Sequence, residues 1–228
     1  NPLSFLRVNK PELEFPPGTD PYSSQVYIRG KDNLTSLIND GFLNQDDTEN
    51  YYIYRITKGN HKQTGLAALL SIEDYNSGVI KKHEFTGKDT ANHIDLLNAQ
   101  VGPLISAFKS NQNIYDHFDR ITSNQPFIQF TADDDTLHEI WIIDNTKLID
   151  KLTIAFSNLE AVYIADGHHR SHAAQQVFEK RKENNPHHTG TEPYNFYLNI
   201  LFPADQLNII AYNRLVKDLN GQSLEQFL

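Results

Sequence analysis

The 228-residue sequence contains no cysteine. This absence excludes disulfides, thiolate zinc ligands and a cysteine nucleophile, so serine, threonine, histidine and carboxylates are the remaining nucleophile candidates. No apolar run approaches the roughly 20 residues that span a bilayer. The opening residues Asn1-Pro2-Leu3 do not begin a signal peptide. We therefore expect a soluble, cytoplasmic protein that makes no membrane contact.

Positive charge is also scarce. The 20 Lys and Arg residues face 29 Asp and Glu residues, which gives a formal net charge of −9. Because an acidic surface repels phosphate backbones, this balance argues against nucleic-acid binding. A local basic pocket remains compatible with it. The chain is also long enough to bury a substantial core.

The order of local patterns predicts an α+β fold, in which helices flank a mixed sheet. Residues 1–20 are rich in proline and are expected to form an extended arm, and residues 21–228 a single α+β domain. Apolar residues at helical spacing predict helices near 22–38, 90–99, 112–121 and 145–156. Aromatic and branched residues predict a hairpin of 51–57 with 64–72, and strands at 79–85, 104–108, 127–130, 137–143, 161–165, 194–202 and 207–212.

The segment 161–170 (AVYIADGHHR) is the most informative part of the sequence. A buried strand runs through Asp166 and Gly167 into a helix. Unpaired backbone N–H groups and the positive end of the dipole make a helix N-terminus a site for anions. Gly167 would let the backbone approach a phosphate, and Arg170 and the two histidines would add charge-assisted donors. An arginine at a helix N-terminus is expected to carry little core packing. The pattern predicts a phosphate or nucleotide site.

The same residues have a plainer interpretation. Asp166 would cap the helix, Gly167 would accommodate the turn, and His168 and His169 would be exposed in the first helical turn.

A metal site is a third interpretation. His168 and His172 are four residues apart and share a helix face, the spacing at which metal-binding helices present two imidazoles. Asp166 or Glu84 would complete the ligand set. Such histidine pairs are common on surface helices, and the internal glutamate of the familiar zinc motif is missing.

The run Lys81-Lys-His-Glu84 supplies further candidates. On a strand, Lys82 and Glu84 share one face. Glu84 is a candidate metal-binding carboxylate or general base with Lys82 beside it, and the alternative is a solvated edge strand. Arg214 is a further phosphate candidate. Asp133 to Asp135 is predicted as a polar hairpin turn rather than a cation site.

Eight short runs resemble those of an uncharacterised bacterial and archaeal family, domain of unknown function 1015. They are Tyr54-Arg55, His61-Lys-Gln-Thr-Gly65, Lys81-Lys-His-Glu-Phe-Thr86, Asn98-Ala-Gln-Val-Gly-Pro103, Phe130-Thr-Ala-Asp-Asp134, Ala165-Asp-Gly-His-His-Arg170, Asn185-Pro-His-His-Thr-Gly190 and Tyr212-Asn-Arg214. Family members are longer at both ends, so this chain is expected to be a fragment of a longer protein. Between Thr86 and His93 it lacks the longer charged stretch of the family.

A more distant resemblance covers only the turn from Asp166 to Arg170. This turn resembles the phosphate-binding turn of the ParB and sulfiredoxin superfamily, which includes free serine kinases with a nucleotide as phosphoryl donor. The resemblance implies that Gly167, His169 and Arg170 contact nucleotide phosphates. His168 stands where sulfiredoxin has its reactive cysteine, so sulfiredoxin chemistry is excluded.

We therefore expect a protein that binds a nucleotide or a phosphometabolite and acts as a phosphotransferase on a small metabolite such as serine or phosphoserine. The expected catalytic residues are Glu84, His168 and Asp166. The expected cofactor is ADP or ATP with Mg²⁺, which is bound by Gly167, His169, Arg170, Lys82 and Arg214, with Asp166 and Glu84 as metal ligands. The alternatives are a metal-dependent phosphohydrolase, in which the metal activates water, and a non-enzymatic sensor of a phosphorylated ligand.

Overall fold

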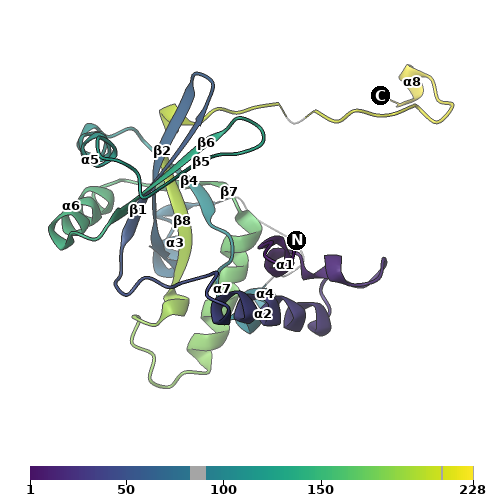
Figure 1. Ribbon diagram of the computed structural model, residues 1–228, viewed down its shortest axis with the longest axis horizontal. Coiled ribbons are helices and arrows are strands. Elements are labelled where there is room, and N and C mark those ends of the chain that lie inside the picture. Colours follow the sequence, from purple (N-terminus) through teal and green to yellow (C-terminus); the bar gives the residue numbers. More distant parts are fainter. Residues whose placement is uncertain (83–90, 212, 228) are drawn as a thin grey trace.

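A computed structural model describes residues 1–82, 91–211 and 213–227. An eight-stranded sheet with both parallel and antiparallel neighbours forms its centre, and helices lie on two sides of it (Figure 1). The predicted α+β fold with a mixed sheet and flanking helices is confirmed.

The strands are β1 (Tyr51–Lys58), β2 (His61–Ser71), β3 (Ile80–Lys81), β4 (Leu104–Phe108), β5 (Ile128–Thr131), β6 (Leu137–Ile143), β7 (Val162–Asp166) and β8 (Phe196–Pro203). The α-helices are α1 (Leu6–Asn9), α2 (Ser24–Asn39), α3 (Ile72–Ser77), α4 (Ala91–Leu97), α5 (Gln112–Thr122), α6 (Thr146–Ser157), α7 (His168–Glu183) and α8 (Leu224–Phe227). Short 3-10 helices are η1 (Pro11–Glu14), η2 (Pro193–Asn195) and η3 (Ala204–Gln206).

The strand order is β3-β7-β4-β8-β2-β1-β6-β5. The pairs β1 with β2 and β5 with β6 are hairpins, as the sequence predicts. Gly59, with a φ of 55°, allows the first tight turn, and Asp135, with a φ of 62°, lies in the second. The parallel pairs β3 with β7 and β4 with β8 join segments that are far apart in the chain.

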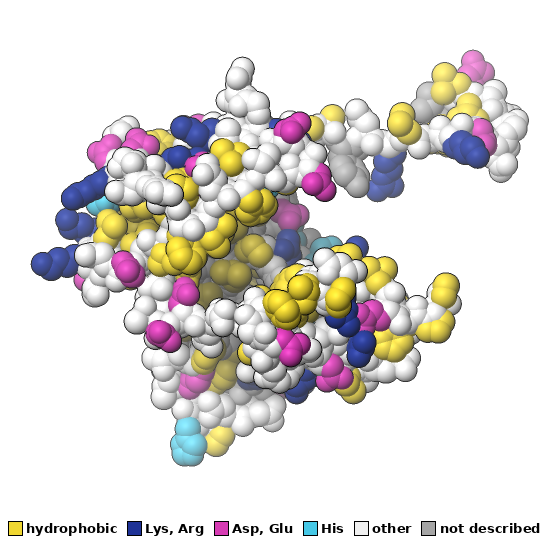
Figure 2. Space-filling model, viewed as in Figure 1, with side chains coloured by type: hydrophobic (Ala, Val, Ile, Leu, Met, Phe, Trp, Pro, Cys, Tyr) yellow, Lys and Arg dark blue, Asp and Glu magenta, His cyan; other side chains and the backbone are white. Residues whose placement is uncertain are grey.

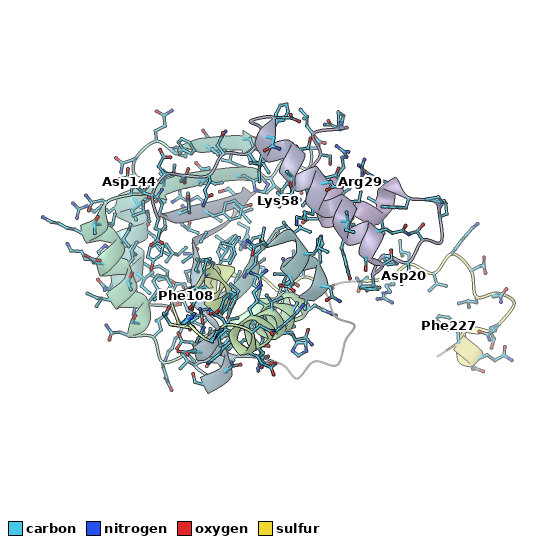
Figure 3. All side chains as sticks on the ribbon, turned by 90° about the horizontal axis from the view of Figure 1, so that it is seen from below. Asp20, Arg29, Lys58, Phe108, Asp144 and Phe227 are labelled. Carbon is cyan, nitrogen blue, oxygen red and sulfur yellow. The ribbon has the colours of Figure 1, made fainter. Side chains whose placement is uncertain are left out.

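Helices α5 and α6 lie on one side of the sheet, and α7, α4, α2 and α1 lie on the other (Figure 1). Phe108 of β4 meets Phe156 of α6 with ring centroids 5.2 Å apart. Phe178 of α7 belongs to the same core cluster. Figure 3 shows Phe108 in the interior and Phe227 on a tail that lies away from it. Because helices cover both faces of the sheet at β4, the sequence of this strand is a short, mainly apolar run.

Residues 1–20 form an arm that is partly helical rather than extended throughout, because they include α1 and η1. Val8 is fully buried and packs with Leu37 of α2 and Leu97 of α4. Glu14 accepts hydrogen bonds from Arg7 and from Arg29 of α2. An apolar contact and an ionic contact therefore hold the arm on the helical layer.

The predicted strand at 207–212 is wrong over residues 207–211, which form no strand. They lead into a C-terminal tail that extends away from the body in Figures 1 and 2, and Ile209 is 104% exposed. Tyr212 lies outside the described residues.

The predicted strand at 79–85 is found only in part. Strand β3 contains Ile80 and Lys81, and residues 83–85 lie outside the described part. Within the part that the structure describes, every helix is too short or too polar to span a bilayer.

Candidate functional site

The turn between β7 and α7 requires glycine for two reasons. Gly167 has a φ of 96°, in the left-handed region that side chains disfavour. A Cβ atom at this position would lie 3.0 Å from Leu104 Cγ and 3.1 Å from Arg170 Nη2. The predicted strand and helix on either side of Gly167 are confirmed. The backbone conformation and the packing of the chain are sufficient to explain this glycine, as the plainer interpretation of the turn expects, without a bound phosphate.

Arg170 ties the start of α7 to the start of β4. Its Nη1 donates to the carbonyl oxygen of Pro103 at 2.5 Å, and its Nη2 donates to Asp166 Oδ2 at 2.8 Å. Gly102 leaves room for the guanidinium, because a Cβ there would lie 3.2 Å from Nη1. Arg170 therefore makes structural contacts in the turn, although its side chain is 40% exposed and belongs to no core cluster among the described residues.

The Asp166 carboxylate binds Arg170 instead of capping the helix. Gly167 is the N-cap residue of α7, and no side-chain cap bond is formed there among the described residues. Asp166 remains largely exposed, whereas Arg170 is half-buried.

A cavity of about 390 Å³ lies beside Arg170. This volume is within the range of pockets that hold small ligands. Its walls come from the arm, α4, the chain that leads into β4, and α7. The lining residues are Asn9, Lys10, His93, Ile94, Gln100, Val101, Gly102, Leu104 and Arg170.

The charge of this cavity is positive. Lys10 and Arg170 line it, and among the described residues no carboxylate does. Lys10 is exposed and forms no ion pair within the described part of the chain. Asp166 partly offsets the charge of Arg170, so Lys10 is the cation that an entering anion would meet without competition from a carboxylate.

His93 forms a neutral wall of the cavity. Its ring stacks on Tyr27 of α2, with centroids 5.6 Å apart. Its Nε2 is buried and faces Gly30, where a Cβ would lie 3.3 Å away. Burial lowers the pKa of His93 below its ordinary value. The imidazole is therefore uncharged at neutral pH.

Gln100 makes the adjoining wall rigid. Its side-chain Nε2 donates to the carbonyl oxygen of Phe196 at 2.8 Å, and its Oε1 accepts from Leu198 N at 2.7 Å. The Gln100 amide thus pairs with the backbone of β8 at Phe196 and Leu198, directly before Asn199, where the pairing of β8 with β4 begins. The loop that carries Gly102 is held in place from both ends, by Gln100 and by Arg170.

A model of the family described as "Protein of unknown function (DUF1015)" matches residues 1–228. The chain belongs to the DUF1015 family. No curated protein and no solved structure matches it significantly. Membership therefore confirms the family resemblance and leaves the activity of the DUF1015 chain to be argued from its site.

The structure brings three of the predicted site residues of the DUF1015 chain together, and these are Asp166, Gly167 and Arg170. His169 is exposed and does not line the cavity. His168 is half-buried, with a buried Nδ1, and its backbone carbonyl accepts a hydrogen bond from Ser171 Oγ. The two histidines thus directly precede Arg170 in the chain, but their side chains do not line the cavity.

The other predicted residues are elsewhere. Lys82 Nζ lies 3.6 Å from the centroid of the Tyr75 ring, and Arg214 is exposed on the C-terminal tail. The structure does not bring either side chain to the cavity. Glu84 lies outside the described residues, so its predicted roles as catalytic carboxylate and metal ligand stay predictions.

The predicted metal site also stays a prediction. Across residues 1–82, 91–211 and 213–227, no three His, Cys, Asp or Glu side chains are grouped closely enough to hold a metal ion. His168 and His172 lie on α7 at the predicted helical spacing, while Asp166 binds Arg170. A carboxylate outside the described part, such as Glu84, would have to complete the set.

Sequence reasoning missed Lys10, His93 and Gln100. Lys10 lies in an arm without a motif, and His93 has no chemically suggestive neighbour in the chain. Gln100 does belong to one of the runs shared with the family, Asn98 to Pro103. That run was the one available signal that this loop contributes to the cavity.

Proposed function

We propose that this DUF1015 protein binds a small phosphorylated molecule, a nucleotide such as ADP or ATP with Mg²⁺ first among them, in the cavity beside Arg170. The observation that carries the proposal is the cavity of about 390 Å³, lined by Lys10 and Arg170 and, among the described residues, by no carboxylate. Such a site is unusual in a chain of net charge −9. A phosphate would meet Lys10 at the arm and the Arg170 guanidinium at the start of α7.

The proposal extends to phosphoryl transfer to or from a small metabolite such as serine. Its support is the short resemblance of the turn at Asp166 to Arg170. In such a transfer the terminal P–O bond of the nucleotide breaks, a bond to the serine hydroxyl oxygen forms, and the hydroxyl proton passes to a base. Glu84 and His168 are the candidate bases.

Lys10→Ala tests binding better than a change at Arg170, because Arg170 also holds the turn before β4. Thermal unfolding is followed in a titration with ADP and Mg²⁺. At a hundredfold excess over Kd, a ligand that binds only the native state stabilises it by about 2.7 kcal/mol. We expect Lys10→Ala to raise Kd about tenfold, since a hydrogen bond to a charged group contributes about 1.5 kcal/mol.

The matched control is Lys31→Ala, which removes an exposed lysine from α2 with the same change of net charge. It should leave Kd unchanged. No saturable shift of the wild type with ADP or ATP, or equal affinities of wild type and Lys10→Ala, would refute the site. Saturable binding of ATP without formation of phosphoserine would instead support the alternative function, a non-enzymatic sensor of a phosphorylated ligand.

A further inference from the structure

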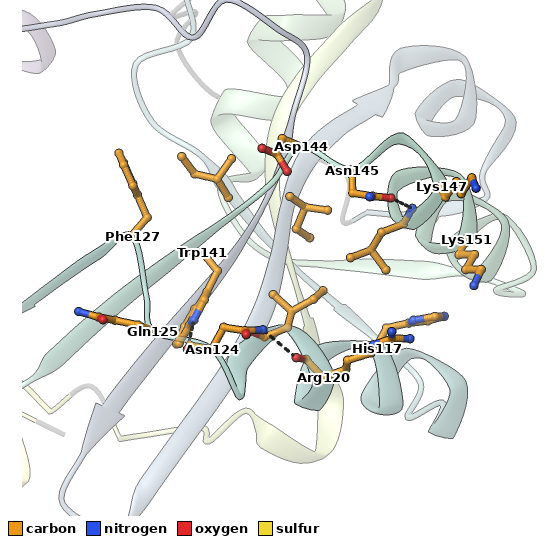
Figure 4. A pocket seen from close by; sticks show the side chains of 14 residues that line it. His117, Arg120, Asn124, Gln125, Phe127, Trp141, Asp144, Asn145, Lys147 and Lys151 are labelled. Atoms are coloured by element: carbon orange, nitrogen blue, oxygen red, sulfur yellow. Dashed lines mark hydrogen bonds between the residues drawn. The ribbon is translucent and has the colours of Figure 1, made fainter.

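A second cavity lies on the opposite side of the sheet from Arg170. It has a volume of about 650 Å³ and lies between α5, α6 and the end of β6 (Figure 4). None of the residues that line the Arg170 cavity lines this one. We call it the α5–α6 cleft.

Basic side chains from both helices line the α5–α6 cleft. His117 and Arg120 are three residues apart on α5, and Lys147 and Lys151 are four apart on α6, so each pair shares a helix face. Figure 2 shows Lys and Arg side chains gathered at the left edge of the molecule, where α5 and α6 lie. Asp144 is the lining carboxylate. The cleft is therefore a positive region on an acidic protein.

These charges are not neutralised internally. Within the described part of the chain, Arg120, Lys147 and Lys151 form no ion pair, whereas Arg181 of α7 binds Asp95 at 2.8 Å. Like charges four residues apart on a helix repel each other. A bound anion would relieve the repulsion between Lys147 and Lys151.

The floor of the cleft is apolar. Ile143 of β6 is 2% exposed and Leu148 of α6 is half-buried there, and Phe127 also lines the cleft, with 68% of its surface exposed. Trp141 is 4% exposed, and its Nε1 donates to the carbonyl oxygen of Asn124 at 2.8 Å. A ligand that matches both the basic rim and this floor has an anionic group joined to an apolar body.

We propose that the α5–α6 cleft binds a small amphipathic phosphomonoester, with its phosphate at Arg120, Lys147 and Lys151 and its apolar body against Phe127 and Leu148. The cleft volume of about 650 Å³ and the overall negative charge of the chain favour a small molecule over a nucleic-acid strand. This site does not depend on the proposed function, because its residues are different.

Trp141 is the one tryptophan of the chain and lines this cleft, so tryptophan fluorescence reports on it directly. The probe is phenyl phosphate, compared at constant ionic strength with inorganic phosphate and with phenol. The test variant is Lys147→Ala/Lys151→Ala. The control variant Lys31→Ala/Lys62→Ala removes two exposed lysines elsewhere and changes the net charge equally.

We expect a saturable fluorescence change with phenyl phosphate and weaker binding of inorganic phosphate. Phenol should show no binding. The test variant should raise Kd about tenfold, and the control should stay within about twofold of wild type. Circular dichroism and thermal unfolding establish that both variants are folded.

Several results would overturn the proposal. They are the absence of a saturable change, an equal loss in both double variants, equal affinity for phenol, and tighter binding of a single-stranded oligonucleotide than of phenyl phosphate. Lys10→Ala separates the two sites. It should leave this titration unchanged, and if it abolished the signal, the fluorescence would be reporting on the Arg170 cavity.

Discussion

Glu14 holds the arm on α2, and the place of Lys10 in the Arg170 cavity depends on that contact. Its carboxylate accepts hydrogen bonds from Arg7, from Arg29 at 2.5 Å and from Asn33 Nδ2 at 3.4 Å. The bond from Arg7 is the largest influence on the pKa of Glu14, burial opposes it, and Arg29 adds to it, so that the pKa falls from 4.5 to about 2. The contacts of the folded protein therefore stabilise the ionised form of the Glu14 carboxyl group over the protonated form.

Glu14→Gln keeps the shape of the side chain and removes its charge. The lowered pKa corresponds to at most about 3 kcal/mol of folding free energy. Because the Glu14 side chain is 21% exposed and that of Arg29 is 45% exposed, solvent screening reduces the expected loss to about 1–2 kcal/mol. A pKa that is lower in the folded state stabilises the protein above pH 4.5, and this stabilisation is lost as the pH falls toward 2.

The assay is urea unfolding of wild type and Glu14→Gln in steps from neutral to acidic pH. Wild type should be more stable at neutral pH, and the difference should shrink as Glu14 is protonated in both states of the wild type. Glu49→Gln, at an exposed position, is the matched control and should match wild type throughout. A difference that is absent at neutral pH, or that is the same at every pH, would refute the ionic basis of the contact.

Two further predictions concern the interior. Gly167→Ala should lower the free energy of unfolding by about 1–2 kcal/mol for the left-handed backbone, and by more because its Cβ meets Leu104 at 3.0 Å. Gly18→Ala, at a similar φ of 90° with open space around it, should show the backbone cost alone, and equal losses in the two variants would contradict the packing argument. Ser106→Ala should cost about 1–3 kcal/mol in thermal unfolding, since Asn199 Nδ2, fully buried, loses the hydroxyl to which it donates at 2.8 Å; an unchanged unfolding temperature would contradict this.

The sequence predicted individual helices, strands and turns, because these depend mainly on residues that are close together in the chain. The hairpin of β1 and β2 follows from alternating aromatic and branched residues around Gly59, and α5 and α6 follow from apolar residues at helical spacing. The strand, glycine and helix at 162–183 were also predicted in the right order.

The same kind of pattern failed at 207–211. Those residues resemble a strand in composition, but a strand exists only where a neighbour supplies hydrogen bonds, and here the chain leaves the sheet. Likewise, the parallel pairing of β4 with β8 could not be derived, because the two strands are separated by α5, β5, β6, α6, β7 and α7 in the chain.

For the candidate site, patterns in the sequence indicated the turn at Asp166 to Arg170, the resemblance to the family and an acidic chain that is compatible with a local basic pocket. The residues that surround Arg170 come together only when the chain is folded. Lys10 and His93 reach the cavity because Val8 and Glu14 dock the arm on the helical layer, and the two basic pairs of α5 and α6 share one cleft because both helices pack on the same face of the sheet. Such contacts join residues distant in the chain, and their energies come from the burial of whole surfaces, which no short segment encodes.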